Sequence, residues 1–466
     1  MKPVLALVGR PNVGKSTLFN RLTRTRDALV ADVPGLTRDR KYGAGKIGER
    51  PYVVIDTGGI GEGLEGVAEP TTEQAELALA EADAVLFLVD GRAGLTAADQ
   101  QLAQQMRTLG KPVHLVVNKT DGLDEDAASA EFYALGLSDV HAIAAVQGRG
   151  VRRLIDRVLE TFPPLAEIDT DAEQAAEQKG IRIAVLGRPN VGKSTLVNRL
   201  LGEERVVVYD MAGTTRDTIE IPYERHGKQY TLLDTAGIRR RGKVFEAVEK
   251  FSVVKAMQAV DDAHVVVLVI DAREGVTEQD LHLLGYIIDA GRSVVMAVNK
   301  WDGLSVEHRE QVKEELGRKL AFAPWMRVHT ISALHGTGVG DLYPLIERAW
   351  ASAFPKISTN ALTRMMEEIV ARNPAPLVGR HRVKLRYAHI GGSNPPRIIL
   401  HGSKANDVPA AYRRYLENRF RELLKLEGTP VRVEFRSGDN PYEGKKNVLT
   451  DRQIKRKRRL MKHVRR

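Results

Sequence analysis

The sequence predicts an α/β protein with two tandem copies of one domain, each a doubly wound and mostly parallel sheet, followed by a smaller α+β domain. The nine-residue string from Gly9 to Thr17 recurs unchanged from Gly187 to Thr195, 178 positions later. Short apolar runs without polar alternation follow in each copy, which is typical of strands covered on both faces of a parallel sheet. The last quarter differs in charge: residues 355–466 hold 27 Lys/Arg and 10 Asp/Glu, whereas residues 1–354 hold 43 and 50. A basic module therefore follows two acidic-to-neutral ones, which indicates a polyanionic partner.

Composition excludes several protein classes. The chain has 466 residues, 43% hydrophobic and 28% charged, and no cysteine. This balance is that of a globular protein of about three domains, not of a collagen or a coiled coil. The lack of cysteine excludes disulfides, thiolate catalysis and Cys-ligated metals. The longest apolar run, Val265–Ile270, is far shorter than the ~20 residues of a membrane span, and the N-terminus has no signal-peptide pattern. We therefore expect a cytoplasmic protein.

The expected strands appear in the same order in both copies. In the first copy they are Val4–Val8, Tyr52–Ile55, Ala84–Val89, Val113–Val117 and Val140–Ala144. In the second copy they are Ile181–Leu186, Tyr230–Leu233, His264–Ile270, Ser293–Val298 and Val328–Ile331. Short polar motifs follow the C-terminal ends of these runs, where doubly wound sheets bind ligands.

The repeat sets the expected domain boundaries. We expect a first domain at 1–161, a linker at 162–179, a second domain at 180–354, a third domain at 355–440 and a tail at 441–466. The linker contains Pro163-Pro164 and then mostly Ala, Gln, Glu and Asp, so it is either flexible or a short exposed helix over Asp171–Gln178.

The repeated nine-residue string has the pattern of a phosphate-binding P-loop. It follows a strand and opens a helix, as that motif requires. Glycines let backbone N–H groups face phosphates, the lysine reaches the β and γ phosphates, and the serine holds Mg²⁺. The residues concerned are Gly9, Gly14, Lys15, Ser16 and Thr17 in the first copy, and Gly187, Gly192, Lys193, Ser194 and Thr195 in the second.

A second motif indicates which base is bound. Asn118-Lys119-Thr120-Asp121 recurs as Asn299-Lys300-Trp301-Asp302, 181 positions later. A carboxylate there accepts both the N1–H and the 2-amino hydrogens of guanine, and adenine cannot match this pairing. Ser332 and Ala333 match a supporting base loop in the second copy, whereas the first copy has Ala144-Ala145-Val146 and lacks the serine.

Two further motifs are expected to respond to the γ-phosphate. Asp56 and Asp234 end strands and lie on the Mg²⁺ side, and Gly59 and Gly237 present a backbone N–H to the γ-phosphate. Thr37 and Thr215 lie where the first switch is expected, and their hydroxyls complete the Mg²⁺ shell when γ-phosphate is present. Such contacts order two loops and release them on hydrolysis.

The residues beside these motifs predict slow hydrolysis. Ile60 and Ile238 stand where Ras-like switches place a water-orienting glutamine, and no residue has the features of a general base. Asn12 and Asn190 occupy the same position in the two P-loops. Their amide oxygens either help hold a potassium ion at the phosphates or only shape the loop.

The third domain is predicted to have the order helix, strand, strand, helix, strand. The elements are Thr359–Ala371, Arg382–Ala388, Arg397–Leu400, Pro409–Leu426 and Val431–Phe435. This order is compatible with a KH-like fold, but the Gly-x-x-Gly loop of RNA-gripping KH domains is missing, and His401-Gly402-Ser403-Lys404 does not supply it. The domain therefore either contacts RNA differently or docks on one of the two repeated domains.

Two basic runs are candidate contacts with phosphate. Arg452–Arg466 holds nine Lys/Arg in fifteen residues and no acid, so it either binds phosphate backbones or is a solvated tail. Arg239-Arg240-Arg241 follows the second aspartate motif and is either an RNA or partner contact or a solvated loop.

Together these motifs resemble the Era-like, translation-associated GTPases, and the tandem arrangement resembles the Der (EngA) family of bacterial ribosome-assembly GTPases. The resemblance covers nearly the whole chain. It implies a cytoplasmic GTPase that binds GTP/GDP with Mg²⁺, is activated by potassium and acts in maturation of the large (50S) ribosomal subunit and its rRNA. It also implies a KH-like C-terminal domain, and we expect a monomer.

Two other functions remain as alternatives. One is a GTP-gated RNA-binding scaffold in which one GTPase site is largely structural. The other is a GTPase serving tRNA modification or the membrane surface, for which the sequence has neither a modification domain nor an amphipathic anchor.

Overall fold

A computed structural model describes residues 2–24, 29–30, 41–57, 78–163, 180–202, 206–208, 220–233, 253–378, 381–403 and 408–437. The expected linker from 164 onward, the Arg239–Arg241 run and the tail at 441–466 lie outside these residues. The chain forms two compact units, Met1–Pro355 with Leu426–Pro430, and Lys356–Lys425 with Val431–Arg466. In the described part, no helix has both the length and the apolar content needed to cross a membrane.

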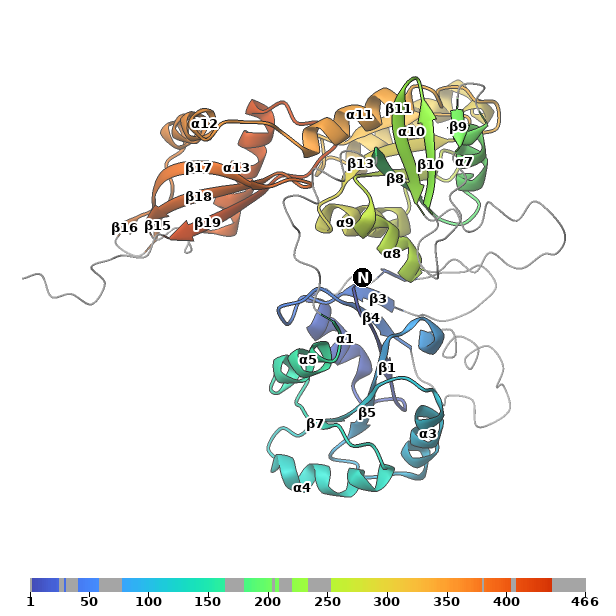
Figure 1. The fold of residues 1–466 in the computed structure, drawn as a ribbon, viewed down its shortest axis with the longest axis vertical. Coiled ribbons are helices and arrows are strands. Elements are labelled where there is room, and N and C mark those ends of the chain that lie inside the picture. The colour runs from blue at the N-terminus through green and yellow to red at the C-terminus, as the bar shows by residue number, and fades with distance from the viewer. Residues whose placement is uncertain are drawn as a thin grey trace, which may run out of the picture. The chain divides into compact units, whose positions relative to one another are not determined.

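The first domain is built on a seven-stranded sheet with the order β2-β3-β4-β1-β5-β6-β7 (Figure 1). Its parallel strands are β1 (Val4–Val8), β4 (Val53–Asp56), β5 (Ala84–Asp90), β6 (Val113–Asn118) and β7 (Val140–Ala142). An antiparallel edge consists of β2 (Leu29–Val30) and β3 (Lys41–Ala44).

The second domain repeats this topology strand for strand, in the order β9-β10-β11-β8-β12-β13-β14. Its parallel strands are β8 (Ile181–Leu186), β11 (Lys228–Leu233), β12 (Val265–Asp271), β13 (Ser293–Asn299) and β14 (Arg327–Thr330). The antiparallel edge is β9 (Val206–Val208) and β10 (Glu220–Arg225).

Helices cover both faces of each sheet, because the strands present apolar side chains on both sides. In the first domain α1 (Lys15–Thr23) and α5 (Val151–Glu160) pack on one face, and α3 (Ala97–Thr108) with η1 (Glu131–Leu135) packs on the other. The short α4 (Glu125–Ala130) precedes η1. In the second domain α7 (Lys193–Leu201) and α11 (Leu342–Ala353) share one face. The other face packs against α8 (Val253–Asp262), α9 (Glu278–Asp289) and α10 (Val306–Lys319), and η2 (Trp301–Gly303) follows β13.

The predicted doubly wound fold is confirmed, and each expected parallel strand overlaps a strand of the structure. The sequence analysis missed the antiparallel edge strands β2, β3, β9 and β10. β3 and β10 lack a continuous apolar run and are only partly buried. β2 and β9 are apolar but only two and three residues long, too short to stand out as strands. Their pairing depends on the neighbouring strand more than on their own pattern.

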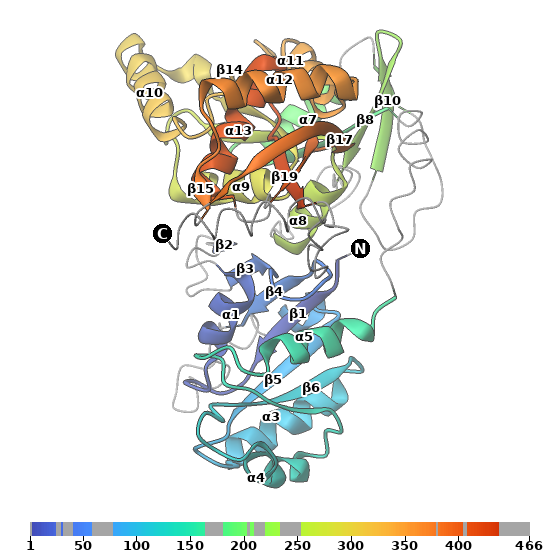
Figure 2. The ribbon, with the colours of Figure 1, turned by 90° about the vertical axis from the view of Figure 1, so that its left-hand side faces the viewer.

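The C-terminal unit contains α12 (Thr359–Arg372), β17 (Lys384–Gly392), β18 (Arg397–Ser403), α13 (Ala410–Leu423) and β19 (Arg432–Ser437), seen from the side in Figure 2. This order is the predicted one. The strand β18 pairs antiparallel with β17 and parallel with β19. A small hairpin of β15 (Leu377–Val378) and β16 (His381–Arg382) precedes the sheet and was not predicted as such.

Candidate nucleotide-binding sites

Each P-loop turns sharply into its helix at a glycine that no other residue can replace. Gly14 has φ +99°, and a Cβ placed on it would lie 2.3 Å from Asn118 Nδ2. Gly192 has φ +97°, and its Cβ would lie 2.3 Å from Asn299 Nδ2. Both the left-handed backbone and the close side chain therefore require glycine.

The first asparagine of each Asn-Lys-x-Asp motif ties the P-loop to the base loop. The Asn118 amide donates to the Val13 carbonyl at 2.8 Å, and its oxygen accepts the Ala145 N–H at 3.0 Å. Asn299 makes the same two bonds, to Val191 at 2.8 Å and from Ala333 at 2.9 Å. The first copy keeps this backbone contact although it has Ala144 where the second has Ser332.

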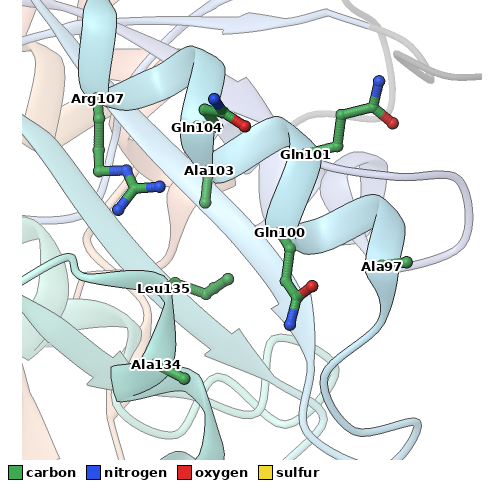
Figure 3. A pocket seen from close by; sticks show the side chains of 8 residues that line it. All are labelled: Ala97, Gln100, Gln101, Ala103, Gln104, Arg107, Ala134 and Leu135. Carbon is green, nitrogen blue, oxygen red and sulfur yellow. The ribbon is translucent and has the colours of Figure 1, made fainter.

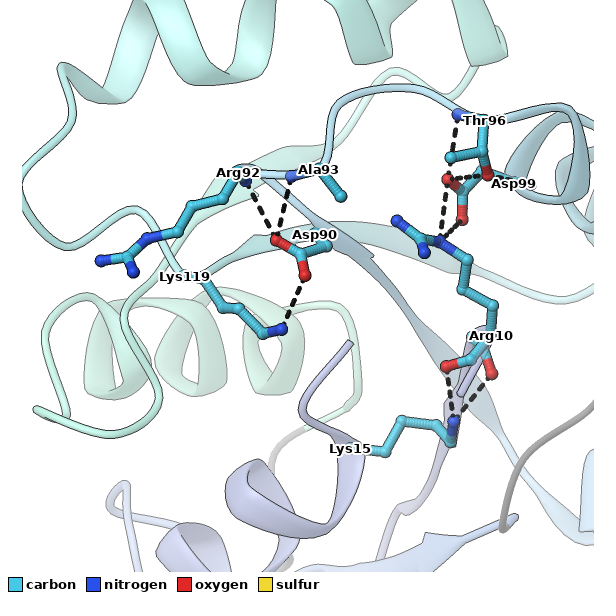
Figure 4. Close-up of polar contacts among 9 residues, drawn as sticks. Arg10, Lys15, Asp90, Arg92, Ala93, Thr96, Asp99 and Lys119 are labelled. Atoms are coloured by element: carbon cyan, nitrogen blue, oxygen red, sulfur yellow. Dashed lines mark hydrogen bonds and ion pairs between the residues drawn. The ribbon is translucent and has the colours of Figure 1, made fainter. Parts of the chain in front are cut away.

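The P-loop lysines lie inside their loops. Lys15 is 6% exposed, and its Nζ donates to the carbonyls of Gly9 at 2.8 Å and Arg10 at 2.9 Å (Figure 4). Lys193 Nζ donates to the Arg188 carbonyl at 2.7 Å. The ammonium groups thus lie where phosphate oxygens would take over from loop carbonyls.

The arginine that follows the first glycine of the P-loop pairs with a buried aspartate and so holds the loop in place. Arg10 Nε lies 3.2 Å from the carboxylate of Asp99, which is fully buried and closes the capping box of α3 with Thr96 (Figure 4). Arg188 and Asp280 form the same pair at 3.1 Å in the second domain. Sequence analysis missed Asp99 and Asp280. They are 181 residues apart, the same spacing as the two Asn-Lys-x-Asp motifs, and this recurrence could have revealed them.

Ser16 and Asp56 form the oxygen pair expected for a magnesium ion. The Ser16 hydroxyl donates to Asp56 Oδ2 at 2.9 Å, and Asp56 is 3% exposed at the end of β4. Hydroxyl and carboxylate oxygens are the ligands Mg²⁺ prefers, and it usually keeps waters as well. The two side chains therefore fit a Mg²⁺ beside the P-loop. Ser194 is the second residue of α7, as Ser16 is of α1.

The lysine of each base motif is held by an aspartate that sequence analysis did not single out. Lys119 Nζ lies 2.6 Å from Asp90 Oδ2 (Figure 4). Lys300 pairs with Asp271 in the same way in the second domain. Burial alone would raise the pKa of Asp90, but the bonds from Lys119 and the Arg92 N–H lower it overall. Each aspartate therefore holds the ammonium group of its lysine in one position at the C-terminal end of the sheet.

The aspartates that end the two Asn-Lys-x-Asp motifs are held differently in the two copies. Asp121 pairs with Arg92, whereas Asp302 lies 3.2 Å from His335 Nε2. A hydrogen bond from Ser332 is the main cause that lowers the pKa of Asp302. Each carboxylate is therefore held beside a basic side chain, but the two partners are unrelated.

The remaining predicted residues divide into two groups. Asn12 and Asn190 are exposed in the P-loops with φ +65° and +63°, and Thr17 and Thr195 are exposed in the first helical turn. The other group lies outside the described residues: Thr37, Gly59, Ile60, Thr215, Asp234, Gly237 and Ile238.

Two other features lie away from these sites. A hollow between α3 and η1 is lined mainly by glutamine, alanine and Arg107 and contains none of the predicted residues (Figure 3). Within the described ranges, one group has the side chains of a metal site: His114, Asp139 and His141. Both imidazoles contact the Asp139 carboxylate at the N-terminal ends of β6 and β7, opposite the nucleotide site.

Family models match both copies of the repeated domain and the C-terminal unit. Residues 4–119 and 182–300 match the family described as 50S ribosome-binding GTPase. Residues 356–436 match the KH-domain-like C-terminal domain of EngA bacterial GTPase enzymes. Among solved structures, the G domain of the T. maritima FeoB iron transporter is 27% identical, covers 34% of this chain and 98% of that one, and has a TM-score of 0.29.

Full-length relatives are much closer. GTPase Der of Alcanivorax borkumensis is 64% identical over 467 residues, covering 100% of this chain and 99% of the relative. GTPase Der of Thioalkalivibrio sulfidiphilus is 59% identical, covering 100% and 99%, and that of Marinomonas sp. is 59% identical, covering 96% and 100%. With two matched GTPase domains and a matched KH-like domain, the chain belongs to the GTPase Der family and is a GTP-binding enzyme that hydrolyses GTP.

Proposed function

We propose that this GTPase acts as a switch in the biogenesis of the large (50S) ribosomal subunit, in the cytoplasm, through contacts with rRNA. The match of both GTPase domains to a ribosome-binding family carries this proposal. The charge of residues 355–466, 27 Lys/Arg against 10 Asp/Glu, supports an RNA-rich partner.

The two sites have the same proposed division of roles. Lys15 and Lys193 neutralise the β and γ phosphates, and Asp121 and Asp302 read guanine. Ser16, Ser194, Thr37 and Thr215 hold Mg²⁺ beside Asp56 and Asp234, and Gly59 and Gly237 present their N–H groups to the γ-phosphate. Mg²⁺ when bound withdraws charge from the phosphates. The Ser16–Asp56 hydrogen bond and the buried Lys15 support this assignment.

Hydrolysis in the isolated protein is proposed to be slow and stimulated by potassium. Ile60 and Ile238 cannot orient water by hydrogen bonding. The exposed Asn12 and Asn190 have amide oxygens suited to a monovalent cation at the phosphates. Replacing KCl by NaCl should lower kcat in the wild type, and much less in the Asn12→Ala, Asn190→Ala double variant.

Co-sedimentation with separated ribosomal subunits tests the proposed function. Full-length protein should bind the large subunit with a non-hydrolysable GTP analogue and release it with GDP. A variant ending at Asp451 should bind more weakly if the basic tail contributes. Binding that ignores the nucleotide would contradict the switch, and no binding to either subunit would contradict the ribosomal role while leaving the GTPase activity intact.

A further inference from the structure

The three-stranded sheet of the C-terminal unit has two chemically different faces. On one face, Ala388, Ile398, Leu400 and Val433 are buried. Buried residues of α12 and α13, such as Met366 and Leu416, provide the apolar partners of this face. Because side chains alternate along a strand, the intervening residues lie on the opposite face.

That opposite face carries a group of three near-parallel rings. Tyr387 on β17 is paired in register with His401 on β18, and their ring centroids lie 4.3 Å apart with an interplanar angle of 7°. His389 lies 5.1 Å from His401 and 6.2 Å from Tyr387, at angles of 25° and 23°. A stacked phenol and two imidazoles on a surface are unusual, because exposed rings more often occur singly.

The outermost ring is open to a further stacking partner. Tyr387 is 43% exposed, among the most exposed large apolar side chains of the C-terminal unit. Strand β17 is an edge strand of the described sheet, so no strand of this sheet covers the side of the Tyr387 ring away from His401. A flat group placed there would extend the stack.

The rings lie among cations. Burial, and then the nearness of His389 and Arg436, lowers the pKa of His401, which favours the neutral imidazole. The register places Lys384, Arg397, Arg432 and Arg436 on this face, against Glu434, which lies 3.9 Å from Arg397. The face therefore combines aromatic surface with a net positive charge.

We propose that this sheet face binds unpaired nucleotides of single-stranded RNA, with a base stacked on Tyr387 and the backbone phosphates along Arg397, Arg432 and Arg436. Stacking suits any base, because every base has a π-face, and cations beside the stack follow the backbone. A double helix does not offer its bases in this way. The inference rests on the proposed ribosomal function, because it names the part of the rRNA that the protein would grip. It also gives the domain an RNA-contacting surface although it lacks a Gly-x-x-Gly loop.

Fluorescence anisotropy with full-length protein tests this. The probes are a fluorescein-labelled 12-nucleotide RNA of mixed sequence and the same strand annealed to its complement. Tyr387→Ala should weaken single-strand binding about tenfold, the effect of losing one stacked base. It should leave duplex binding and GTP hydrolysis unchanged, and Tyr387→Phe should retain the wild-type affinity.

Two further variants separate stacking from charge. Tyr133→Ala removes a 59% exposed tyrosine from η1 of the first domain and should change nothing. Arg436→Ala should weaken both RNA forms and reduce the slope of log affinity against log salt by roughly 0.7 for the single strand. Tyr387→Ala should leave that slope unchanged, since it removes no charge.

Failure of the inference and failure of the proposed function can be told apart. Equal single-strand affinities of Tyr387→Ala and wild type would overturn the inference. If, in addition, Tyr387→Ala lost large-subunit binding, the face would dock a protein instead of RNA. If wild-type protein ignored ribosomal subunits but bound single strands through Tyr387, the inference would stand and the ribosomal role would fall.

Discussion

The two GTPase domains are alike at one end of their sheets and different at the other. At the C-terminal ends of the strands, the glycine turn, the asparagine tie and the Lys–Asp pair recur with distances that agree within about 0.1 Å. Such a site must match one ligand with several groups at once, so each position is constrained by all the others.

At the N-terminal ends the same backbone need is met by different side chains. In the first domain Asp83 accepts the Val4 N–H at 2.8 Å. In the second domain the equivalent acceptor is His264 Nδ1, which takes the Arg182 N–H at 3.2 Å. No ligand imposes a particular group there, so any acceptor that satisfies the buried donor suffices.

The N-terminal ends of the last two strands of each sheet also carry different side chains in the two domains. In the first domain their N-terminal ends carry the His114–Asp139–His141 group. In the second domain Arg327 of β14 pairs with Glu427, and the Val294 N–H of β13 donates to the Gly428 carbonyl at 2.7 Å. One copy therefore uses this edge for a polar cluster, and the other uses it to hold the segment Leu426–Pro430.

The largest effect is expected when each P-loop lysine is removed in turn, which tests whether the two nucleotide sites act alike. Lys15→Ala and Lys193→Ala should each lower turnover at their own site by about 10²–10³-fold, as loss of a preorganised charge at phosphate does. Single-turnover hydrolysis on each variant measures this, with Lys313→Ala on exposed α10 as control. If one variant left total turnover unchanged, that site would be a binding site only, and the scaffold alternative would gain support.

The base loops offer a test that addresses one site at a time. Asp121→Asn or Asp302→Asn should weaken GTP binding at that site by at least about a hundredfold, because the amide opposes the guanine 2-amino group with a donor. The asparagine variant should instead bind xanthosine triphosphate, because the amide N–H can donate to its 2-oxo group. Equilibrium binding with both nucleotides checks this. If the loss of GTP affinity differed between the two sites, Arg92 and Ser332 would position their aspartates with different success.

The acceptors at the N-terminal ends predict a difference in acid sensitivity. Burial, and then Arg182 and Arg292, lowers the pKa of His264 to about 4. Below pH ~6.5 this histidine takes up a proton in the unfolded chain but stays neutral in the folded chain. Its contribution to the free energy of unfolding is therefore complete above pH ~6.5 and is lost as the pH falls toward ~4. From pH 7 to pH 5 the second domain should lose about 2 kcal/mol from this group.

Urea unfolding at both pH values, followed by Trp fluorescence, measures that loss. His264→Asn keeps an acceptor for the Arg182 N–H and should flatten the pH dependence. His226→Asn, at an exposed turn with φ +51°, should not. An unchanged slope in His264→Asn would mean that other groups cause the acid sensitivity.

The smallest effect concerns the segment held by the second domain. Gly428 has φ +66°, and a Cβ there would lie 2.7 Å from the Cβ of Ala349. Gly227 has φ +75° with nothing within 4 Å of its Cβ. Both glycine-to-alanine changes add backbone strain, but only Gly428→Ala adds a clash, so it should lower the free energy of unfolding by about 1 kcal/mol more. Chemical denaturation of both variants compares them; equal losses would mean that the segment shifts away without cost.

Much of this molecule could be predicted from local patterns. The continuous apolar runs predicted the ten parallel strands, because a strand covered on both faces of the sheet carries apolar side chains at successive positions. The P-loop and Asn-Lys-x-Asp strings predicted guanine nucleotides, because phosphate and guanine each demand particular groups at set spacing. The edge strands β3 and β10 escaped, because a half-exposed strand is defined by its partner. Asp90 and Asp99 escaped for a different reason: an aspartate at the end of a strand or in the first turn of a helix is common, and only its recurrence 181 positions later, as Asp271 and Asp280, marks it out.

By itself the sequence determined the repeated fold, the nucleotide class and the basic character of the last quarter, since repetition, motif spacing and net charge are properties of the chain order. Only the tertiary structure decided which acceptor holds each lysine, which partner orders Asp121 and Asp302, and that Tyr387, His389 and His401 form one stack. These contacts join residues from different strands or loops, and a register shift of one residue would undo the stack by sending Tyr387 to the opposite face.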